Sequence, residues 1–349
     1  MLTFGVVGCG YWGPNLIRNL NSLPDCEVKY VCDTRVERLA HMRHLYPQVT
    51  TTNRFNDLVD DPDVDAVIVA VPVRYHYEMA QKALEAGKHT FIEKPMARSS
   101  IECLRLIETA EQRRLTLMVG HTFVYSTPVR KIKEIVDSGQ LGDIQYVSSR
   151  RLNLGLFQKD INVAWDLAPH DISILLHILG EAPISVNCQG KSHVMKGIED
   201  VTDLSLQFAN GTYASIQSSW LHPSKVRETI VVGTKMMLVY DDLEPNEKIK
   251  IYDKRVEVPP YYDTFAEFQY SYYYGDVHCP FLKLTEPLKT ECEHFRDCIV
   301  SGTGPESGGV EGLRVVQILE AASASLANGG GLIKITEPMQ AGTPVASLA

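Results

Sequence analysis

The sequence predicts an α/β protein with two domains: a doubly wound parallel sheet over residues 1–123, and a domain with a largely antiparallel sheet over residues 124–349. The chain has 349 residues, more than the roughly 250 to 300 at which a single core stops growing. Strand-like and helix-like segments alternate up to about residue 123, which is typical of parallel sheets with helical crossovers. Beyond it, strand-like segments follow one another with few helices between them.

The expected strands of the first domain are short apolar or β-branched runs. Within the expected strand 65–72, residues 66–72 are continuously apolar, as in a parallel strand that is covered on both faces. Pro14 suits the first turn of the helix that follows the first strand. Strands are expected at 2–8, 27–33, 49–52, 65–72, 89–93 and 115–120, and helices at 13–22, 35–46, 75–86 and 99–113.

The second domain is expected to be a sheet covered on one face by helices. Asn210-Gly211 is a strong hairpin signal between two of its strands. The expected strands are 143–154, 184–193, 201–210, 212–221, 227–242 and 248–258, and the covering helices are 165–179, 286–301 and 310–328.

Composition narrows the class of function. A net charge of −9 argues against a nucleic-acid-binding surface, which needs concentrated Lys and Arg. The longest apolar run, 66–73, is far below the ~20 residues that span a bilayer, and the N-terminus lacks a signal-peptide pattern. Eight scattered cysteines without CxxC pairs favour a reducing compartment, and Cys292, His294 and Cys298 are not expected to bind a metal. We therefore expect a cytoplasmic protein with no metal, nucleic-acid or membrane partner.

The segment "GVVGCGYWGPN" carries a dinucleotide-binding pattern, Gly8-x-Gly10-x-x-Gly13, between a strand and a helix. The glycines permit a tight turn, close approach of a pyrophosphate and close helix packing. Asp33 ends the second strand, where a carboxylate binds the adenine ribose diol. A glycine-rich turn without a ligand is the alternative. The residues expected at the cofactor from this loop and the second strand are Gly8, Gly10, Tyr11, Trp12, Gly13, Asp33, Thr34 and Arg35.

The choice of cofactor depends on the residues that follow the second strand. Asp33 favours NAD, because a carboxylate repels the 2′-phosphate of NADP. Arg35 leaves NADP open, since an arginine at this place can pair with that phosphate.

The stretch "FIEKPMA" places Glu93 and Lys94 at the end of the fifth expected strand. Ligands of doubly wound sheets bind beyond the carboxyl ends of the strands, where Val71 and Pro72 also fall. An ammonium there can hydrogen-bond a substrate hydroxyl and stabilise an alkoxide, and Glu93 is expected to contact the cofactor. Pro95 ends the strand and allows a cis bond. The alternative is an ordinary Lys–Glu pair at a strand end.

The second candidate for chemistry lies on a helix that is expected to begin near Asp166, with Pro169 in its first turn. His170 then falls in the same turn, near the Asp166 carboxylate. The helix N-terminus lowers the pKa of a histidine and a carboxylate raises it, so His170 is suited to acid–base work near neutrality. The alternative is that Asp166 is only an N-cap and His170 only a surface residue.

Three features together resemble the Gfo/Idh/MocA oxidoreductases: the glycine fingerprint, the pattern from "AVP" to "AGKH" and "EKP" (70–95), and Asp166-x-x-x-His170. The resemblance runs from residue 3 to about 330. It implies an N-terminal Rossmann domain, a C-terminal α/β domain with a large, mostly antiparallel open sheet that forms homodimers or homotetramers, a nicotinamide cofactor, and a sugar or polyol substrate. It assigns substrate contact to Lys94, acid–base work to His170 with Asp166, and a place near the nicotinamide to His76.

Two segments, 150–180 and 286–299, look similar to nucleotide-sugar 3-dehydrogenases and 3-ketoreductases of amino- and deoxysugar pathways. "INVAW" before Asp166 and Val73-Arg74 depart from the family pattern. We expect hydride transfer between nicotinamide and a ring carbinol, C3 of a nucleotide-linked sugar. The alternatives are a dehydrogenase of a free sugar, inositol or aminoglycoside, and a non-catalytic NAD(P)-binding regulator.

In the expected reaction, His170 takes the hydroxyl proton, Asp166 orients His170, and Lys94 stabilises the alkoxide. Further substrate contacts are expected among polar residues near the helix of His170 or the last strand of the first domain, any of which can instead be strand-surface residues. They are His121, Tyr125, Arg151, Asn153, Lys159 and Asn162.

Overall fold

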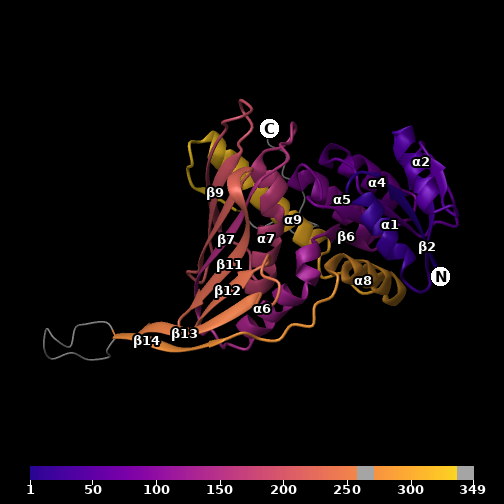
Figure 1. Cartoon of the computed structure of the whole chain (residues 1–349). Helices are drawn as coiled ribbons and strands as arrows, with labels where there is room; N and C mark the ends of the chain where they lie inside the picture. The colour runs from indigo at the N-terminus through magenta and orange to yellow at the C-terminus, as the bar shows by residue number, and fades with distance from the viewer. Residues whose placement is uncertain (258–270, 336–349) are drawn as a thin grey trace, which may run out of the picture. The chain divides into compact units, whose positions relative to one another are not determined.

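The computed structural model describes residues 1–257 and 271–335, and its contacts divide the chain into two units (Figure 1). The first contains Met1–Thr122 and Glu286–Glu320, and the second contains Phe123–Thr285 and Ala321–Ile333. The first change of unit lies one residue from the division at residue 123 that the sequence suggests. The return of Glu286–Glu320 to the first unit has no counterpart in the sequence-based division, which places all of 124–349 in the second domain.

The first unit is built on a six-stranded parallel sheet in the order β3-β2-β1-β4-β5-β6. This confirms the doubly wound sheet. The strands are β1 (Leu2–Val7), β2 (Cys26–Cys32), β3 (Thr50–Thr52), β4 (Ala66–Val69), β5 (His89–Glu93) and β6 (Leu117–Gly120). The helices are α1 (Gly13–Asn21), α2 (Val36–Leu45), α3 (Asn56–Val59), α4 (His76–Glu85) and α5 (Ser100–Arg113), with a 3₁₀ turn at Val73–Tyr75.

Helix α8 (Pro287–Ser301) belongs to the first unit, so the prediction that it covers the second sheet is wrong. The Phe295 ring lies 6.3 Å from Phe4 of β1 and 5.7 Å from Phe91 of β5, between ring centroids. Glu286, just before α8, accepts a hydrogen bond from Arg18 of α1. The apolar stripe of α8 is visible in the sequence, but a stripe alone does not say which of two sheets it covers.

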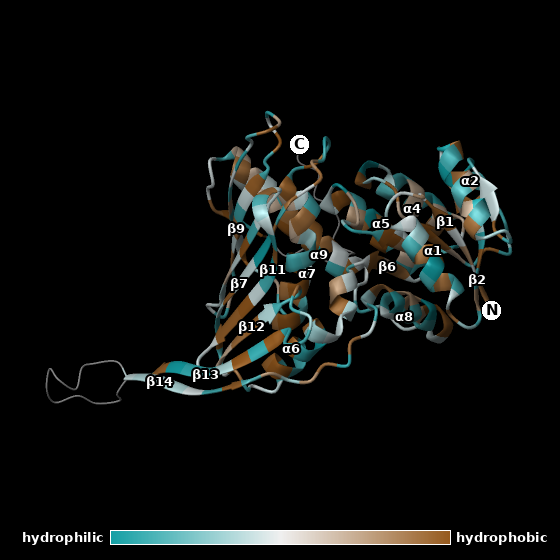
Figure 2. Ribbon diagram, viewed as in Figure 1, coloured by the Kyte–Doolittle hydropathy of each residue, from teal (hydrophilic) through white to brown (hydrophobic). Residues whose placement is uncertain are grey.

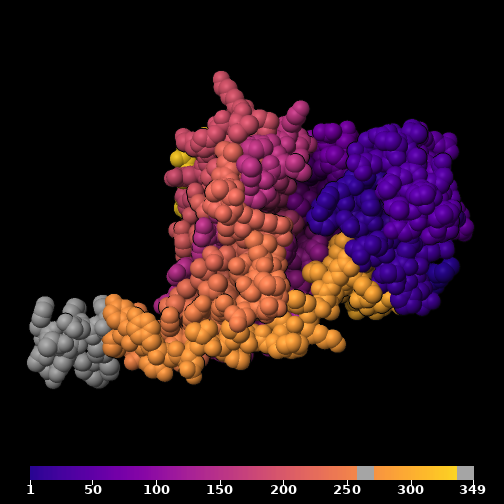
Figure 3. All heavy atoms as spheres, in the orientation of Figure 1, coloured from indigo at the N-terminus to yellow at the C-terminus, as the bar shows by residue number. Residues whose placement is uncertain are grey.

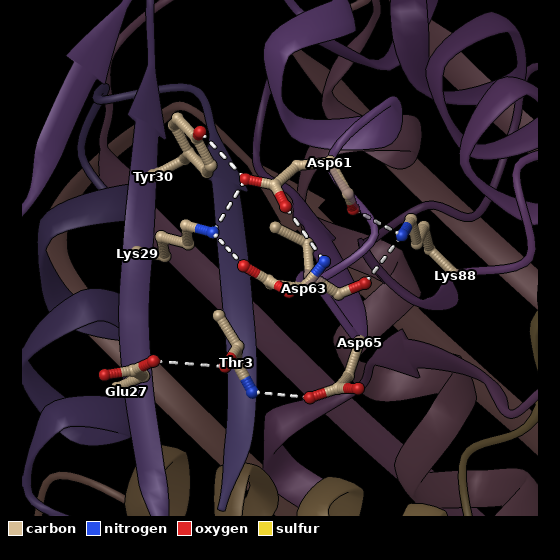
Figure 4. Close-up of polar contacts among 9 residues, drawn as sticks. Thr3, Glu27, Lys29, Tyr30, Asp61, Asp63, Asp65 and Lys88 are labelled. Carbon is tan, nitrogen blue, oxygen red and sulfur yellow. Dashed lines mark hydrogen bonds and ion pairs between the residues drawn. The ribbon is translucent and has the colours of Figure 1, made fainter.

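A polar network holds the strand ends opposite the predicted site (Figure 4). Lys29 pairs with Asp61 at 2.8 Å and with Asp63 at 3.0 Å. The backbone N–H of Thr3 donates to Asp65 Oδ2 at 2.8 Å. These contacts link β1 and β2 to the segment before β4, at the amino ends of β1 and β4. Contacts within the protein therefore occupy this end of the sheet.

The second unit contains a nine-stranded sheet in the order β14-β13-β12-β11-β7-β10-β9-β8-β15. Only β7 and β10 pair in parallel among the recorded pairs of the described residues, and the pairs from β14 to β7 and from β10 to β8 are antiparallel. The predicted mostly antiparallel sheet is confirmed. The strands are β7 (Ile144–Leu154), β8 (Ser185–Lys191), β9 (Val201–Gln207), β10 (Tyr213–Ser219), β11 (Leu221–Gly233), β12 (Met237–Asp241), β13 (Ile249–Glu257), β14 (Ser271–His278) and β15 (Ile333–Lys334).

Three details of the second sheet differ from the prediction. The single expected strand 227–242 is two strands, β11 and β12, which turn at residues 234–236. The first of them begins earlier, at Leu221. Strand β14 was not predicted, although its aromatic residues are typical of strands.

The helices of the second unit cover one face of its sheet. They are α6 (Thr127–Asp137), α7 (Val163–Leu179) and the end of α9 (Gly309–Ala327), which crosses the division after Glu320. Helix α7 packs on β7, β9 and β10. Hydrophobic residues recur along α7 and α9, and the strands of the sheet carry both hydrophobic and hydrophilic residues (Figure 2). In β9 and β10 buried residues alternate with exposed or half-buried ones, as expected for a sheet with one covered face.

Helix α7 begins at Val163 rather than near Asp166, so the predicted helix start is wrong. Asn162 is the N-cap, because its side chain accepts a hydrogen bond from the Trp165 N–H at 3.1 Å. Pro169 therefore lies inside the helix and His170 in its third turn rather than its first.

Within residues 1–257 and 271–335, no helix combines the length and the apolar character needed to cross a bilayer.

Candidate active site

The glycine-rich turn after β1 has the geometry of a phosphate-binding loop. Gly8 has φ +99°, and a Cβ there would lie 2.2 Å from the Ala70 carbonyl oxygen. A Cβ at Gly13 would lie 1.9 Å from the carbonyl oxygen of Gly8. A Cβ at Gly10 meets nothing within 4 Å. Gly8 and Gly13 are thus required by the turn itself, whereas Gly10 leaves open space beside the backbone.

The N-terminus of α1 faces this turn without a side-chain cap. Trp12 is the N-cap residue and makes no capping hydrogen bond. Its ring meets that of Tyr11 edge to face, with centroids 5.1 Å apart, and both side chains are exposed, Tyr11 at 79% and Trp12 at 40%. The first N–H groups of a helix bind anions. The open position at Gly10 and the uncapped helix fit the pyrophosphate of a dinucleotide.

Asp33 follows β2 and is almost completely buried. Its Oδ2 accepts the Cys9 N–H at 2.7 Å, and its Oδ1 accepts the Arg35 N–H at 2.9 Å and Arg35 Nε at 3.2 Å. Burial raises the pKa of Asp33, but the hydrogen bonds from Arg35 and Cys9 outweigh it and leave the pKa below its ordinary value. The residue is therefore a carboxylate at neutral pH, the form that accepts hydrogen bonds from a ribose diol.

The "EKP" turn follows β5, with a cis peptide bond between Lys94 and Pro95. His76, at the start of α4, lies between two backbone carbonyls: Nδ1 is 2.8 Å from the Pro95 oxygen and Nε2 is 2.7 Å from the Val71 oxygen. Burial lowers the pKa of His76. Both ring nitrogens face backbone carbonyls, one in the segment after β4 and one in the turn of Lys94, and a neutral ring donates a hydrogen bond to one of the two. Its predicted contact with the nicotinamide stays a prediction.

Two further carboxyl groups of the first unit are buried, Glu93 at the end of β5 and Glu291 of α8. Glu93 is 7% exposed, its Oε2 accepts the Lys94 N–H at 3.3 Å, and burial raises its pKa to about 7 although the Lys94 charge opposes this. Glu291 of α8 is fully buried, and its Oε2 accepts Thr122 Oγ1 at 2.8 Å. Burial and then the charge of Glu93 raise the pKa of Glu291 well above its usual value. Burial thus disfavours the ionised form of both carboxyl groups, and the Lys94 charge favours it at Glu93.

His121 follows β6 and is 1% exposed. Among the described residues neither ring nitrogen has a hydrogen-bond partner. Burial, and after it the positive charge of Lys94, lower the pKa of His121 to about 3. It is a neutral imidazole in the field of the Lys94 ammonium, with a free donor and a free acceptor.

In the second unit, His170 and Asp166 of α7 are held by aromatic residues. The Phe123 ring meets the His170 ring at 5.2 Å between centroids and an angle of 68°. Trp220 Nε1 donates to Asp166 Oδ2 at 3.1 Å. Phe123 thus contacts the residue that is predicted to take the proton, and Trp220 contacts the residue that is predicted to orient it.

The predicted substrate contacts of the second unit fall into two groups. The first has protein partners: Arg151 donates to Asp171, Asn162 caps α7 and donates to Glu199 Oε2 at 2.8 Å, and Tyr125 is buried with the Arg130 guanidinium 5.6 Å from its ring centroid. The second group is more accessible: Asn153 is half-buried on β7, and Lys159 is exposed before α7.

The candidate residues gather within each unit. Gly8, Gly10, Gly13, Asp33, Thr34, Arg35, Val71, Pro72, His76, Glu93, Lys94 and His121 lie at or after the carboxyl ends of strands of the parallel sheet, while Tyr125, Arg151, Asn153, Lys159, Asn162, Asp166 and His170 lie in the second unit. The sequence interpretation missed Glu291, Asp171 and Trp220. The sequence does carry a signal for Glu291, because a glutamate there falls on the apolar stripe formed by Leu288, Cys292 and Phe295 of the expected helix.

The described residues hold no group of three or more His, Cys, Asp or Glu side chains that could bind a metal ion. Cys298 Sγ and His294 Nε2 are 3.4 Å apart, and the Glu306 N–H donates to the same nitrogen at 3.0 Å.

Family models match both parts of the chain. Residues 2–121 match the model described as an oxidoreductase family with an NAD-binding Rossmann fold, and residues 129–239 match the GFO/IDH/MocA C-terminal domain.

Individual relatives agree with this result. The "Uncharacterized oxidoreductase YrbE" of Bacillus subtilis (strain 168) is 25% identical over 340 residues, which cover 93% of this chain and 94% of the relative. The inositol 2-dehydrogenase of Salmonella typhimurium (strain LT2) is 32% identical over 186 residues, 52% of this chain and 55% of the relative.

A solved structure, UDP-N-acetylglucosamine 3-dehydrogenase GnnA from Acidithiobacillus ferrooxidans, shares the fold, with a TM-score of 0.75, 24% identity, and coverage of 94% of this chain and 98% of that chain. With both family domains matched in their order along the chain, the protein belongs to the Gfo/Idh/MocA oxidoreductases and is an NAD(P)-dependent enzyme that acts on CH–OH groups.

Proposed function

We propose that the enzyme transfers a hydride between a ring carbinol of a sugar, C3 of a nucleotide-linked sugar, and C4 of nicotinamide. The observation that carries the proposal is the placement of Lys94. It follows β5 of the NAD-binding sheet, in a turn whose Pro95 carbonyl oxygen lies 2.8 Å from His76 Nδ1. The likeness to a UDP-N-acetylglucosamine 3-dehydrogenase over 94% of the chain supports the nucleotide-linked substrate.

Each proposed catalytic residue has one task. His170 accepts the proton of the carbinol during oxidation and returns it during reduction. Asp166, restrained by Trp220, orients His170. Lys94 donates a hydrogen bond to the carbinol oxygen and stabilises the alkoxide that develops as the hydride leaves. Bound NAD supplies the carbon that accepts the hydride.

The cofactor is held in this proposal by the loop of Gly8, Gly10 and Gly13, with the pyrophosphate at the uncapped start of α1. Asp33 accepts the hydroxyl groups of the adenine ribose. Its lowered pKa supports NAD over NADP, since an ionised carboxylate repels a 2′-phosphate.

His121 is the best supported of the further substrate contacts, because it is a buried imidazole near Lys94 whose nitrogens have no partner among the described residues. Tyr125, Asn153, Lys159 and Asn162 remain proposals of lower rank. A homodimer or homotetramer through the second sheet is supported by β14, the strand at its edge. Tyr272 is 67% exposed there and Tyr274 is 71% exposed. The orange surface of β13 and β14 is seen in Figure 3.

A free sugar or inositol is the second candidate substrate class, favoured by the 32% identity with inositol 2-dehydrogenase. An absorbance assay at the NADH band distinguishes the classes. Turnover with UDP-N-acetylglucosamine above that with glucose or myo-inositol supports the proposal, and preference for myo-inositol overturns the nucleotide-linked assignment.

Lys94→Ala tests the role of the lysine. We expect NADH binding within about threefold of wild type and a kcat at least about 100-fold lower, the usual size of one such electrostatic contribution. Wild-type turnover with retained NADH binding contradicts the catalytic role assigned to Lys94.

A further inference from the structure

Arg151 of β7 and Asp171 of α7 form a buried ion pair. Arg151 Nε donates to Asp171 Oδ2 at 2.6 Å and Nη2 donates to Oδ1 at 3.1 Å, and the two side chains are only 6% and 2% exposed. Desolvation of two charges can cost as much as their attraction returns, so a buried ion pair is weak evidence for stability. What this pair does provide is a fixed orientation of a planar guanidinium.

Asp171 is anchored to the sheet as well as to Arg151. Ser149 Oγ donates to Asp171 Oδ1 at 2.8 Å, and Thr229 Oγ1 lies 3.2 Å from the same hydroxyl. Ser149 and Thr229 are opposite residues of β7 and β11. The carboxylate therefore accepts three hydrogen bonds from β7, and the guanidinium cannot rotate without breaking two of them.

Phe123 contacts both this guanidinium and the candidate base. Arg151 Cζ is 4.6 Å from the Phe123 ring centroid, and the His170 ring meets the same phenyl ring at 5.2 Å and 68°. A cation above an aromatic face and an edge-to-face ring pair are both favourable arrangements. Contacts therefore run without a break from the Arg151–Asp171 ion pair through Phe123 to His170. We call Arg151, Phe123 and His170 the stack.

We infer that Arg151, Asp171 and Phe123 are positioning residues that set the orientation of the His170 ring, with Arg151 acting through Phe123. The inference rests on the proposed role of His170 as the proton acceptor. A base must present one ring nitrogen to the carbinol oxygen, and small misplacements of such a group lower the rate strongly. It also gives Arg151 a task other than the substrate contact that the sequence suggests, since two of its donor atoms are engaged by Asp171.

The position of His170 is tested without any substrate. In protein labelled with ¹³C at histidine Cε1, His170→Asn identifies the His170 signal among eleven histidines. We expect Phe123→Leu to move this signal, because the ring current of the phenyl group is lost, and Phe123→Tyr to leave it near its wild-type position. Arg151→Met made together with Asp171→Asn keeps the phenyl ring, and we expect it to move the signal as well, because Phe123 and His170 then change their relative orientation. Phe208→Leu, a truncation of a buried phenylalanine elsewhere in the second unit, is the matched control. A signal that stays in place in Phe123→Leu or in the Arg151/Asp171 variant overturns the inference.

Kinetics with NAD⁺ and UDP-N-acetylglucosamine test the coupling. Arg151→Met is made together with Asp171→Asn, so that no buried charge is left unpaired. We expect Phe123→Leu and the Arg151/Asp171 variant each to lower kcat by about tenfold with KM within about twofold, and the combination to lower kcat by about tenfold rather than 100-fold. A rise in KM for the sugar in the Arg151/Asp171 variant, or multiplied effects in the combination, contradicts a path through Phe123.

The two experiments separate this inference from the proposed function. If the labelled signal moves as expected but His170→Asn turns over at the wild-type rate, the stack holds His170 and the acid–base role fails. If His170→Asn is inactive but the His170 signal of the otherwise unchanged protein is unaffected in the Arg151/Asp171 variant, the acid–base role stands and the positioning role fails. If UDP-N-acetylglucosamine is not turned over, the labelled signal alone decides the positioning role.

Discussion

Glu291 is a fully buried carboxyl group whose pKa is raised first by its burial and then by the charge of Glu93, the last residue of β5. The two residues are 198 positions apart and come together because α8 returns to the first unit. No hydrogen bond joins them, so their interaction is one of charge. Ionising the second carboxyl group costs more free energy than ionising the first, and the Lys94 charge favours the ionised form of Glu93.

This relationship predicts how stability depends on pH. A carboxyl with a raised pKa in the folded state stabilises the protein below its unfolded pKa, and that contribution is lost as the pH rises through the folded value. For Glu93 the window runs from 4.5 to about 7. We expect Glu93→Gln and Glu291→Gln to raise the Tm relative to wild type at pH 8 more than at pH 5. Scanning calorimetry at both pH values measures this, with Glu293→Gln on the same helix as the control. Equal changes at both pH values would contradict it.

Substitutions of the loop glycines should distinguish an effect on folding from an effect on NADH binding. A Cβ at Gly13 collides with the Gly8 carbonyl, whereas one at Gly10 enters open space. Gly13→Ala should therefore lower the Tm by several degrees, because backbone must move. Gly10→Ala should keep the wild-type Tm and weaken NADH binding by about tenfold or more, since its methyl group occupies the place of the pyrophosphate. Thermal unfolding and NADH titration give both values, and unchanged binding in Gly10→Ala would disprove the assignment of the loop.

Asp33 should control the choice of cofactor. Its carboxylate engages the Arg35 guanidinium at 3.2 Å, and Arg35 is itself half-exposed. Asp33→Ser removes the charge that repels a 2′-phosphate and releases Arg35 to pair with one. The ratio of kcat/KM for NADPH to that for NADH should rise by about 100-fold. Adding Arg35→Met to Asp33→Ser should abolish most of the gain, and a gain that survives the second change would exclude Arg35 as the phosphate partner.

Trp12 should report cofactor binding directly. It is the N-cap of α1 and is 40% exposed, whereas Trp220 is 1% exposed. NADH at the start of α1 should accept energy from Trp12, so titration should quench protein fluorescence. Trp12→Phe should lose most of this quenching with NADH affinity changed less than about threefold, which equilibrium dialysis measures independently. Trp165→Phe is the control, and full quenching in Trp12→Phe would place the cofactor elsewhere.

Much of the first unit could be predicted because its signals are local. A continuous apolar strand, a glycine turn and an uncapped helix stand next to each other in the sequence, so Gly8, Asp33 and Lys94 could be placed at strand ends without knowledge of the rest. The second sheet was predicted in type but not in detail, since the strands β11 and β12 were joined into one and β14 was missed.

The errors come from choices that local sequence does not decide. Asn162 and Asp166 are both good N-caps, and the hydrogen bond from Trp165 selects the first. The partner of Arg151 is 20 positions away on α7, and the partner sheet of α8 depends on the path of the whole chain. Periodicity identifies a buried helix face but not the surface that it covers.

The contact of Phe295 with Phe4 and Phe91 has a consequence for synthesis on the ribosome. The six strands of the parallel sheet have all been made once residue 120 has left the exit tunnel, but the ring that completes their core follows 175 residues later. At about 5 to 20 residues per second, the nascent sheet waits roughly 10 to 35 s with the apolar patch around Phe4 and Phe91 uncovered. This is the interval in which a chaperone that binds apolar surface would have most to offer the growing chain.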